Sequence, residues 1–341
     1  MAQLPSFHRH GNGPCCSPGF LLSPFGWAAV PIALIVSADP RLLVDLFGVT
    51  RERMHLIALA LAHMEGLGSL ETASLLIRDP TRAVLQRVLR RCPIGIKRVL
   101  KHLPPQVLRR QNYVALVDLL DNPQSARVLH HATSINDLVI QVLAELPPSL
   151  RRPLSSAVPD WPRTLVGLSQ SLHFLVCRGV NGSFDDLVAS LAAVTARRQL
   201  TALVREWIGS LPLPETMPPR TISNARRLDS GKELCSLAKT WHNCLDSYTD
   251  SIDAGHCAVY LWEDANNPAA CLVRRRDRLG WFLDEVQGPN NIDLDPDHVE
   301  VIAAIFDKAD VPRTSIVSAI EAILYPDLGV GIADGEACCG R

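Results

Sequence analysis

Two kinds of proline landmark recur at the same interval in the N-terminal half of the chain. Pro80 and Pro123 each follow an Asp or Asn and precede an apolar pattern, and the Leu-Pro-Pro sequences that end at Pro105 and Pro148 are separated by that same interval. A repeat length of roughly 40 to 47 residues is typical of HEAT and armadillo helical repeats. This spacing therefore constrains the fold more than any other feature of the chain.

The residues around these landmarks favour helices. An Asp or Asn side chain before a proline caps the first backbone N–H groups of a helix, while the proline fits the first helical position. Pro40 has the same context, and the segments between the landmarks carry apolar residues at helical spacing. We therefore expect residues 37–212 to form an α-helical repeat array of the HEAT or armadillo kind, with each unit packed on its neighbours.

A change of character follows this array. Residues 213–232 contain three prolines and no sustained periodicity, which predicts a proline-rich linker. Residues 233–325 then show an amphipathic helix, three short β-rich runs separated by turn sequences, and a helix that starts at Asp295-Pro296. This order predicts a small α+β domain in which a three-stranded antiparallel meander packs on helices.

The two ends and the cysteines bear on localisation. We expect residues 1–36 to be a flexible, apolar N-terminal segment and residues 326–341 a loose tail. Pro24 and Pro31 interrupt the apolar run, which favours no membrane partner and leaves open whether the segment is a targeting signal. Ten scattered cysteines without a CxxC pair indicate a reducing, cytoplasmic setting and no zinc ribbon.

The charge is local rather than global. A net charge of −1 excludes a uniformly basic nucleic-acid-binding protein, but no Asp or Glu occurs between Thr81 and Arg110. This stretch either binds the phosphates of nucleic acid or forms ordinary solvated helix faces, and the residue pattern supports both interpretations. The candidate binding residues are Arg87, Arg90, Arg91, Lys97, Arg98 and Lys101.

Reactive residue types gather between Trp241 and Gly255. The pattern predicts a helix up to Gly255, whose apolar stripe turns Cys244 toward the sheet and places His242 beside Asp246 on the adjacent face. This placement favours Cys244 as a buried thiol of the core over Cys244 as a nucleophile. Two further interpretations stay open: zinc bound by His242, Cys244 and His256, and a nucleophilic Cys–His pair. We expect no metal and no cofactor.

These residues resemble the PcfJ-like proteins of bacterial plasmids, phages and other mobile elements. The likeness covers about residues 235–310 and consists of His-x-Cys followed by Tyr, a glycine before the first strand, and a Gly-Pro-x-Asn turn after the third. The matching residues are His242, Cys244, Tyr248, Gly255, Gly288, Pro289 and Asn291. The resemblance implies an association with conjugation or mobile DNA but no settled activity.

The chain departs from the family pattern at two places. The middle strand lacks the glutamate that the family often carries, and Glu285 stands where a glutamine is usual. If the family has a catalytic centre, these changes put it in doubt here.

Two functions follow from these features. The first is a binding or scaffold protein that acts beside nucleic acid or a protein of a mobile-element system. The alternative is an enzyme of unknown reaction whose catalytic candidates are His242, Cys244, Tyr248, Glu285 and Asn291. A third hypothesis is a toxin or antitoxin component, and no feature of the sequence distinguishes it from the first two. Geometry distinguishes the first two, because an enzyme needs these side chains to converge on an open pocket.

Overall fold

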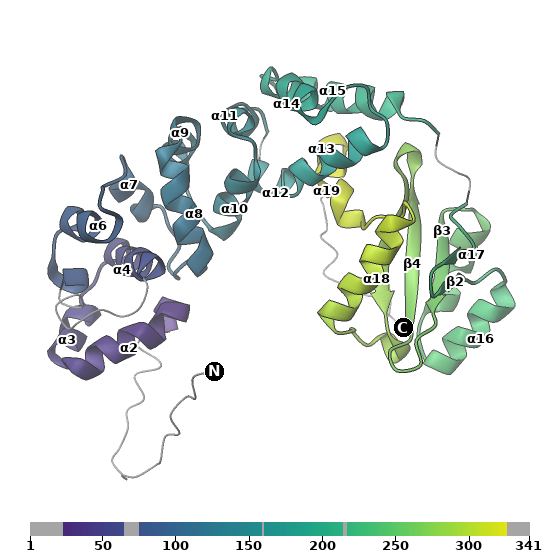
Figure 1. The fold of residues 1–341 in the computed structure, drawn as a ribbon, viewed down its shortest axis with the longest axis horizontal. Helices are drawn as coiled ribbons and strands as arrows, with labels where there is room; N and C mark the ends of the chain where they lie inside the picture. The colour runs from purple at the N-terminus through teal and green to yellow at the C-terminus, as the bar shows by residue number, and fades with distance from the viewer. Residues whose placement is uncertain (1–22, 65–74, 159, 214–216, 326–341) are drawn as a thin grey trace, which may run out of the picture. The chain divides into compact units, whose positions relative to one another are not determined.

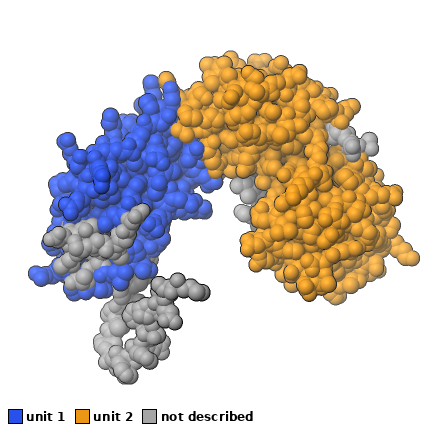
Figure 2. Space-filling view, in the orientation of Figure 1, with its two compact units in different colours: residues 1–144 blue, residues 145–341 orange. Residues whose placement is uncertain are grey.

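The computed structural model describes residues 23–64, 75–158, 160–213 and 217–325. The chain divides into two compact units, residues 1–144 and residues 145–341 (Figure 2). The expected tail and most of the expected N-terminal segment lie outside the described residues. Across the ranges that the structure describes, none of the helices has the length and apolar character needed to cross a membrane.

The described residues of unit 1 form helices around a buried central helix (Figure 1). That helix is α4 (Arg51–His63), which buries nine consecutive residues and packs against α6 (Thr81–Leu89), α7 (Ile96–Lys101) and α8 (Arg110–Asp121). A helix that is buried on all sides lies inside the unit and exposes no polar face to solvent. The other helices here are η1 (Ser23–Ala28), α2 (Ala29–Ala38), α3 (Arg41–Phe47), α9 (Pro123–His131) and α10 (Asp137–Glu145).

A histidine inside unit 1 is fully hydrogen-bonded. The ring of His55 lies between the carbonyl oxygen of Pro104, 2.7 Å from Nε2, and the hydroxyl of Tyr113, 2.6 Å from Nδ1. Because a carbonyl oxygen only accepts, Nε2 carries the proton and Nδ1 accepts from Tyr113. The Tyr113 oxygen in turn accepts the Leu108 N–H at 3.2 Å. Burial lowers the pKa of His55, so the neutral ring is the folded form.

The expected helix starts are present, but the capping chemistry varies. Asn122 accepts from the N–H groups of Gln124 and Ser125 at the start of α9, as predicted. At α6, Pro80 rather than Asp79 precedes the first helical residue and no side chain caps the helix. Whether successive helices repeat as HEAT or armadillo units stays a prediction.

The start of the described chain is helical rather than irregular. Residues 23–36 were expected to belong to a flexible segment, yet they form η1 and most of α2. Phe25 and Ile32 are buried, and the Trp27 indole N–H donates to the carbonyl oxygen of Leu108 at 2.8 Å. These contacts order the segment because they bury its apolar side and use its polar group.

Five helices at the start of unit 2 cluster with the sheet that follows them. In α13 (Leu168–Cys177), the ring of Phe174 lies 5.4 Å from that of Phe282, and the Ser171 hydroxyl donates to the Ile316 carbonyl. We expected this region to continue the helical array up to residue 212, whereas the compact units divide at residue 144. The remaining helices are α11 (Pro148–Ala157), α12 (Trp161–Thr164), α14 (Phe184–Ala192) and α15 (Arg197–Ser210).

The sheet of unit 2 has five antiparallel strands in the order β1-β2-β3-β4-β5, rather than the three expected. The predicted β-rich runs form β3 (Cys257–Trp262), β4 (Ala269–Arg276) and β5 (Gly280–Gln287). The two further strands, β1 (Thr221–Ile222) and β2 (Ala225–Arg227), come from the segment expected to be a linker. They form a hairpin whose turn contains Ser223 at a positive φ of 52°.

Helices cover both faces of this sheet (Figure 1). On one face, α16 (Gly231–Trp241) and η2 (Leu245–Tyr248) pack on Val259 and Leu272. On the other face lies α18 (Pro296–Lys308), which begins with the predicted Asp295 cap and packs Phe306 against Tyr260. The remaining short elements are α17 (Thr249–Asp253), η3 (Asp277–Leu279), η4 (Pro289–Asn291), η5 (Thr314–Val317) and α19 (Ser318–Leu324).

Candidate functional site

The helix that carries the reactive-looking residues is broken. We expected it to continue to Gly255, but α16 ends at Trp241 and His242 adopts a left-handed conformation with φ of 48°. The N–H groups of His242 and Asn243 both donate to the Ala238 carbonyl oxygen and close the helix end. His242 and Asp246 are therefore not an i, i+4 pair on one helix, and both side chains are exposed.

Cys244 lies in the turn after this break rather than in the core. Its residue is partly exposed, and the apolar cluster beneath α16 contains Leu245 and Tyr248 but not Cys244. The cysteines buried in the sheet are Cys257 and Cys271. Cys244 is therefore not among the buried residues of the core, as the predicted helical stripe would have placed it, because the helix ends at Trp241 before it.

Tyr248 and Glu285 approach a charged group on the sheet. The guanidinium carbon of Arg274 lies 5.7 Å from the centre of the Tyr248 ring, and its Nε lies 2.5 Å from Asp284 Oδ2. An irregularity in the pairing of β4 with β5 leaves Asp284 without a partner in the register, while Glu285 pairs with Leu272. Such a bulge lets two consecutive acidic residues approach one arginine.

The environment of this cluster shifts two protonation equilibria. Burial raises the pKa of the Glu285 carboxyl, and Asp284 raises it further while Arg274 opposes the shift. Burial also raises the pKa of the Tyr248 phenol, and the nearby Glu285 and Cys244 act in the same direction. Of the five catalytic candidates, Glu285 and Cys244 therefore both act on Tyr248.

The other two catalytic candidates do not join them. His242 is exposed at the end of α16, and Asn291 is exposed in η4 with φ of 55°. Within the described residues, no hydrogen bond or ion pair connects either side chain to Tyr248 or Glu285. The arrangement has a tyrosine, a carboxyl group and an arginine in contact range, without the histidine that the enzyme hypothesis requires.

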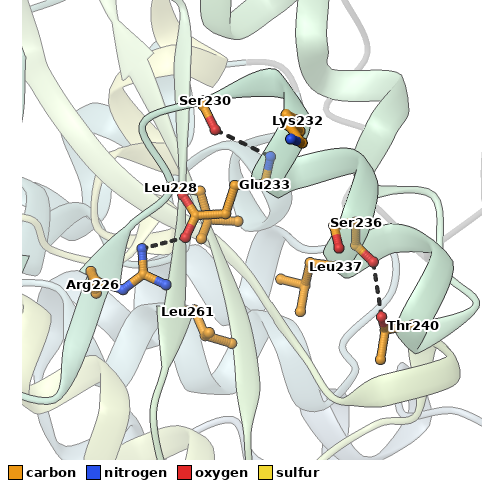
Figure 3. A pocket seen from close by; sticks show the side chains of 9 residues that line it. All are labelled: Arg226, Leu228, Ser230, Lys232, Glu233, Ser236, Leu237, Thr240 and Leu261. Atoms are coloured by element: carbon orange, nitrogen blue, oxygen red, sulfur yellow. Dashed lines mark hydrogen bonds and ion pairs between the residues drawn. The ribbon is translucent and has the colours of Figure 1, made fainter.

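A groove lies beside this cluster, between α16 and the β1–β2 end of the sheet (Figure 3). Its volume is about 410 Å³, and leucine side chains from three elements form its apolar floor. None of the five catalytic candidates lines it. The floor residues are Leu228, Leu237 and Leu261, and the polar rim consists of Arg226, Ser230, Lys232, Glu233, Ser236 and Thr240.

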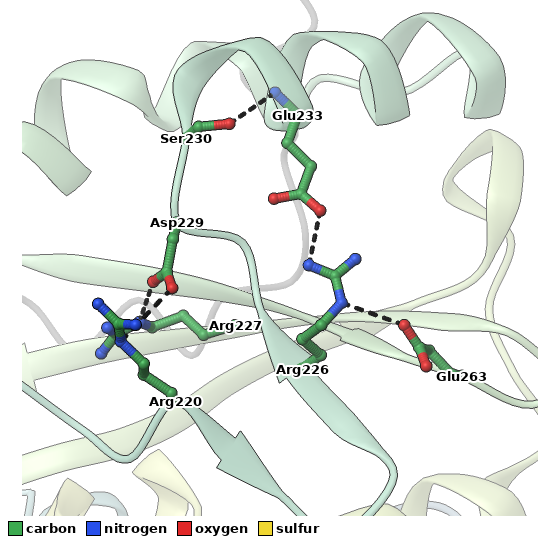
Figure 4. Close-up of polar contacts among 7 residues, drawn as sticks. All are labelled: Arg220, Arg226, Arg227, Asp229, Ser230, Glu233 and Glu263. Carbon is green, nitrogen blue, oxygen red and sulfur yellow. Dashed lines mark hydrogen bonds and ion pairs between the residues drawn. The ribbon is translucent and has the colours of Figure 1, made fainter.

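The arginines around this groove are held by acids (Figure 4). Arg226 Nη1 lies 2.6 Å from Glu233 Oε1, and its Nε lies 3.2 Å from Glu263 Oε1. Arg227 Nε donates to Asp229 Oδ1 at 2.8 Å. The Arg226–Glu233 pair connects β2 to the first turn of α16, while the other two pairs connect β2 to the residue after β3 and to the loop before α16.

The cationic candidates of unit 1, unlike the arginines around the groove, are mostly without ion-pair partners in the described residues. All six side chains are exposed, and they lie along α6, the following loop and α7. Arg91 pairs with Asp121, while the other five make no ion pair within the described ranges of the chain. These six residues, Arg87, Arg90, Arg91, Lys97, Arg98 and Lys101, are called the basic surface below.

The sequence interpretation missed several residues that shape the sheet site. Arg274 and Asp284 were not singled out, although the alternating Arg274 and Arg276 of one β-rich run and the acidic Asp284 and Glu285 of the next were visible in the sequence. Arg226 was missed because its strand was taken for a linker. Among the residues that the structure describes, no group of three or more His, Cys, Asp or Glu is placed to hold a metal ion.

Comparison with known proteins identifies no relative. The chain matches no protein-family model, no curated protein and no solved structure.

Proposed function

We propose that this chain is a PcfJ-like accessory protein of a mobile element that binds nucleic acid through the basic surface of unit 1. The observation that carries the proposal is the exposure of six cationic side chains, five of them without an ion-pair partner in the described ranges. A helical array of the HEAT or armadillo kind would suit such a role, because its neighbouring helices present charges along one continuous face.

Phosphate is the ligand that these side chains suit best. Exposed lysines and arginines lose little hydration when they meet a phosphate backbone, and the counterions released from the nucleic acid favour binding. No acidic residue between Thr81 and Arg110 opposes this attraction locally. The nearest acid that pairs with the surface is Asp121, at the end of α8.

The geometry supports an enzyme less well. Catalysis by the five candidates requires them to surround one reacting group, but His242 and Asn291 face solvent on separate elements. The groove of unit 2 contains none of the five. The resemblance to PcfJ-like proteins points toward mobile DNA and carries no established reaction.

Charge reversal tests the proposal. We would replace Arg87, Lys97 and Arg98 by Glu together and measure binding of the full chain to fluorescently labelled single-stranded and double-stranded DNA by anisotropy. Each phosphate contact contributes about −0.9 to the slope of log K against log salt for duplex DNA. The triple variant should therefore bind at least about 100-fold more weakly at low salt, with a slope shallower by roughly 3.

A control variant with the same change in charge separates local from global effects. Arg41, Arg163 and Arg220 are highly exposed, with 90%, 77% and 81% of their side-chain surface accessible, and they lie outside the basic surface. Replacing these three by Glu should leave most of the binding intact. The proposal fails if wild-type protein does not bind nucleic acid at low salt, or if both triple variants lose affinity equally.

A further inference from the structure

We propose that Ile94 is a wedge that inserts between base pairs of a DNA duplex held by the basic surface. The inference rests on the proposed function and specifies its ligand as double-stranded DNA that bends on binding. Ile94 is 84% exposed in the loop between α6 and α7, more than the other large apolar side chains in the described part of the chain. Arg90 and Arg91 precede it in the same loop, and Lys97 follows it in the first turn of α7.

The loop holds this side chain outward through specific backbone contacts. Pro93 is buried and fixes the backbone just before Ile94. The carbonyl oxygen of Ile94 lies 3.2 Å from Nε2 of His130, and the following Gly95 has φ of 78°. A Cβ at Gly95 would lie 2.0 Å from that same nitrogen, so a larger residue would displace the His130 ring and would also be strained at this positive φ. The backbone is anchored on both sides of an apolar tip that contacts water.

This combination fits a known way of deforming DNA. Proteins that kink DNA insert apolar side chains such as Leu, Ile or Phe between base steps, and nearby cations hold the phosphates on either side. Insertion removes the isoleucine from water and opens a bend that brings more backbone toward the protein. Pyrimidine–purine steps, which unstack most easily, should be preferred.

An anionic membrane is the other ligand that attracts cations with an apolar group. Peripheral membrane binding usually needs a broad apolar face of a helix to enter the headgroup region. Here the apolar part is one side chain in a short loop, and exposed helix residues on both sides of it, such as Arg87 and Arg98, are charged. A narrow apolar tip among cations fits a gap between stacked bases better than a lipid surface.

Fluorescence resonance energy transfer between the ends of a duplex tests the inference. Binding of the full chain to a duplex of about 30 base pairs with a central TA step should bring the ends closer and raise the transfer efficiency. Ile94→Ala should remove at least half of this rise, weaken affinity by less than about tenfold and leave the salt slope unchanged, because phosphate contacts remain. Ile94→Leu, which keeps an apolar wedge, should retain the bend.

Val44→Ala is the matched control, because Val44 is 73% exposed in the same unit and lies outside the basic surface. It should change neither the affinity nor the bend. A duplex that stays straight when bound, or that bends equally with Ile94→Ala, overturns the wedge and leaves the proposed function standing. Absence of any duplex binding overturns both. Tighter Ile94-dependent binding to phosphatidylserine vesicles than to the duplex would assign the loop to a membrane surface instead.

Discussion

The arginines around the sheet of unit 2 and those of the basic surface in unit 1 differ in their partners. Around the sheet of unit 2, Arg226, Arg227 and Arg274 are each paired with a carboxylate from a neighbouring strand, loop or helix. Along the basic surface of unit 1, only Arg91 has such a partner in the described residues. Paired arginines stabilise the arrangement of secondary structure, whereas unpaired and exposed ones are available to a ligand. This difference is the basis of the proposal that the basic surface, rather than the sheet of unit 2, meets a ligand.

The largest effect on stability is expected at Asp284. Its carboxylate lies 2.5 Å from Arg274 Nε and 3.4 Å from Arg276 Nη2, and its side chain is only 16% exposed. Asp284→Asn removes the carboxylate that pairs with Arg274 and leaves Arg276 only its contact to Glu321 at 3.6 Å, so unit 2 should lose about 3 kcal/mol of unfolding free energy. Urea denaturation of the full chain measures this. Glu263→Gln, at the exposed pair with Arg226, is the control, and an equal loss there would remove the distinction between buried and exposed pairs.

A smaller loss is expected when the loop of the basic surface is altered. Gly95→Ala imposes a left-handed conformation on alanine and a clash with His130, which together should cost about 2 kcal/mol. Gly209→Ala in α15 is the contrasting control, because nothing lies within 4 Å of the added carbon and its φ is negative. That change should stabilise unit 2 by about 0.5 to 1 kcal/mol. Thermal unfolding distinguishes the opposite signs, and a neutral Gly95→Ala would show that the loop is not held as described.

Acid should weaken unit 1 through His55 by less than either substitution. The folded state keeps this ring neutral, since burial lowers its pKa, while the unfolded chain binds a proton near the ordinary value of about 6.5. Stability is therefore full above that value and falls as the pH drops below it. Hydrogen–deuterium exchange in α4 should accelerate between about pH 7.5 and pH 5.5 after correction for intrinsic rates. His131→Gln, at an exposed histidine, should leave this change intact, and a flat profile would contradict a neutral buried ring.

The smallest effect is expected at an exposed ion pair of unit 2. Arg226→Ala removes contacts to Glu233 and Glu263, but all three side chains are substantially exposed. Solvent screens such pairs, so the loss should stay below about 1 kcal/mol. Urea denaturation again provides the measurement. A loss as large as that of Asp284→Asn would mean that exposed pairs also determine the stability of the sheet.

Local sequence patterns predicted the elements whose causes are local. The alternation and turn residues located β3, β4 and β5, and the cap-plus-proline signature located the starts of α9 and α18 through Asn122 and Asp295. The basic surface was visible because charge and the absence of acids can be read directly from the sequence.

Features that depend on tertiary contacts could not be read in this way. The strands β1 and β2 span two and three residues, too short for an alternation to show. The left-handed conformation of His242, which ends α16, cannot be predicted from its residue type. Because the helix ends there, Cys244 does not lie on the predicted helical stripe. The meeting of Tyr248, Arg274 and Glu285 depends on the register irregularity at Asp284, which forms only when β4 and β5 pair.

A footprint of DNA on the full chain tests the central claim most directly. Hydrogen–deuterium exchange would be followed with and without a saturating duplex at low salt, across both units in one experiment. The account predicts slower exchange in α6, the loop that carries Ile94 and α7, and no change in α16 or β5. Protection confined to α16 and β5 would contradict it and move the ligand site to the paired arginines of unit 2.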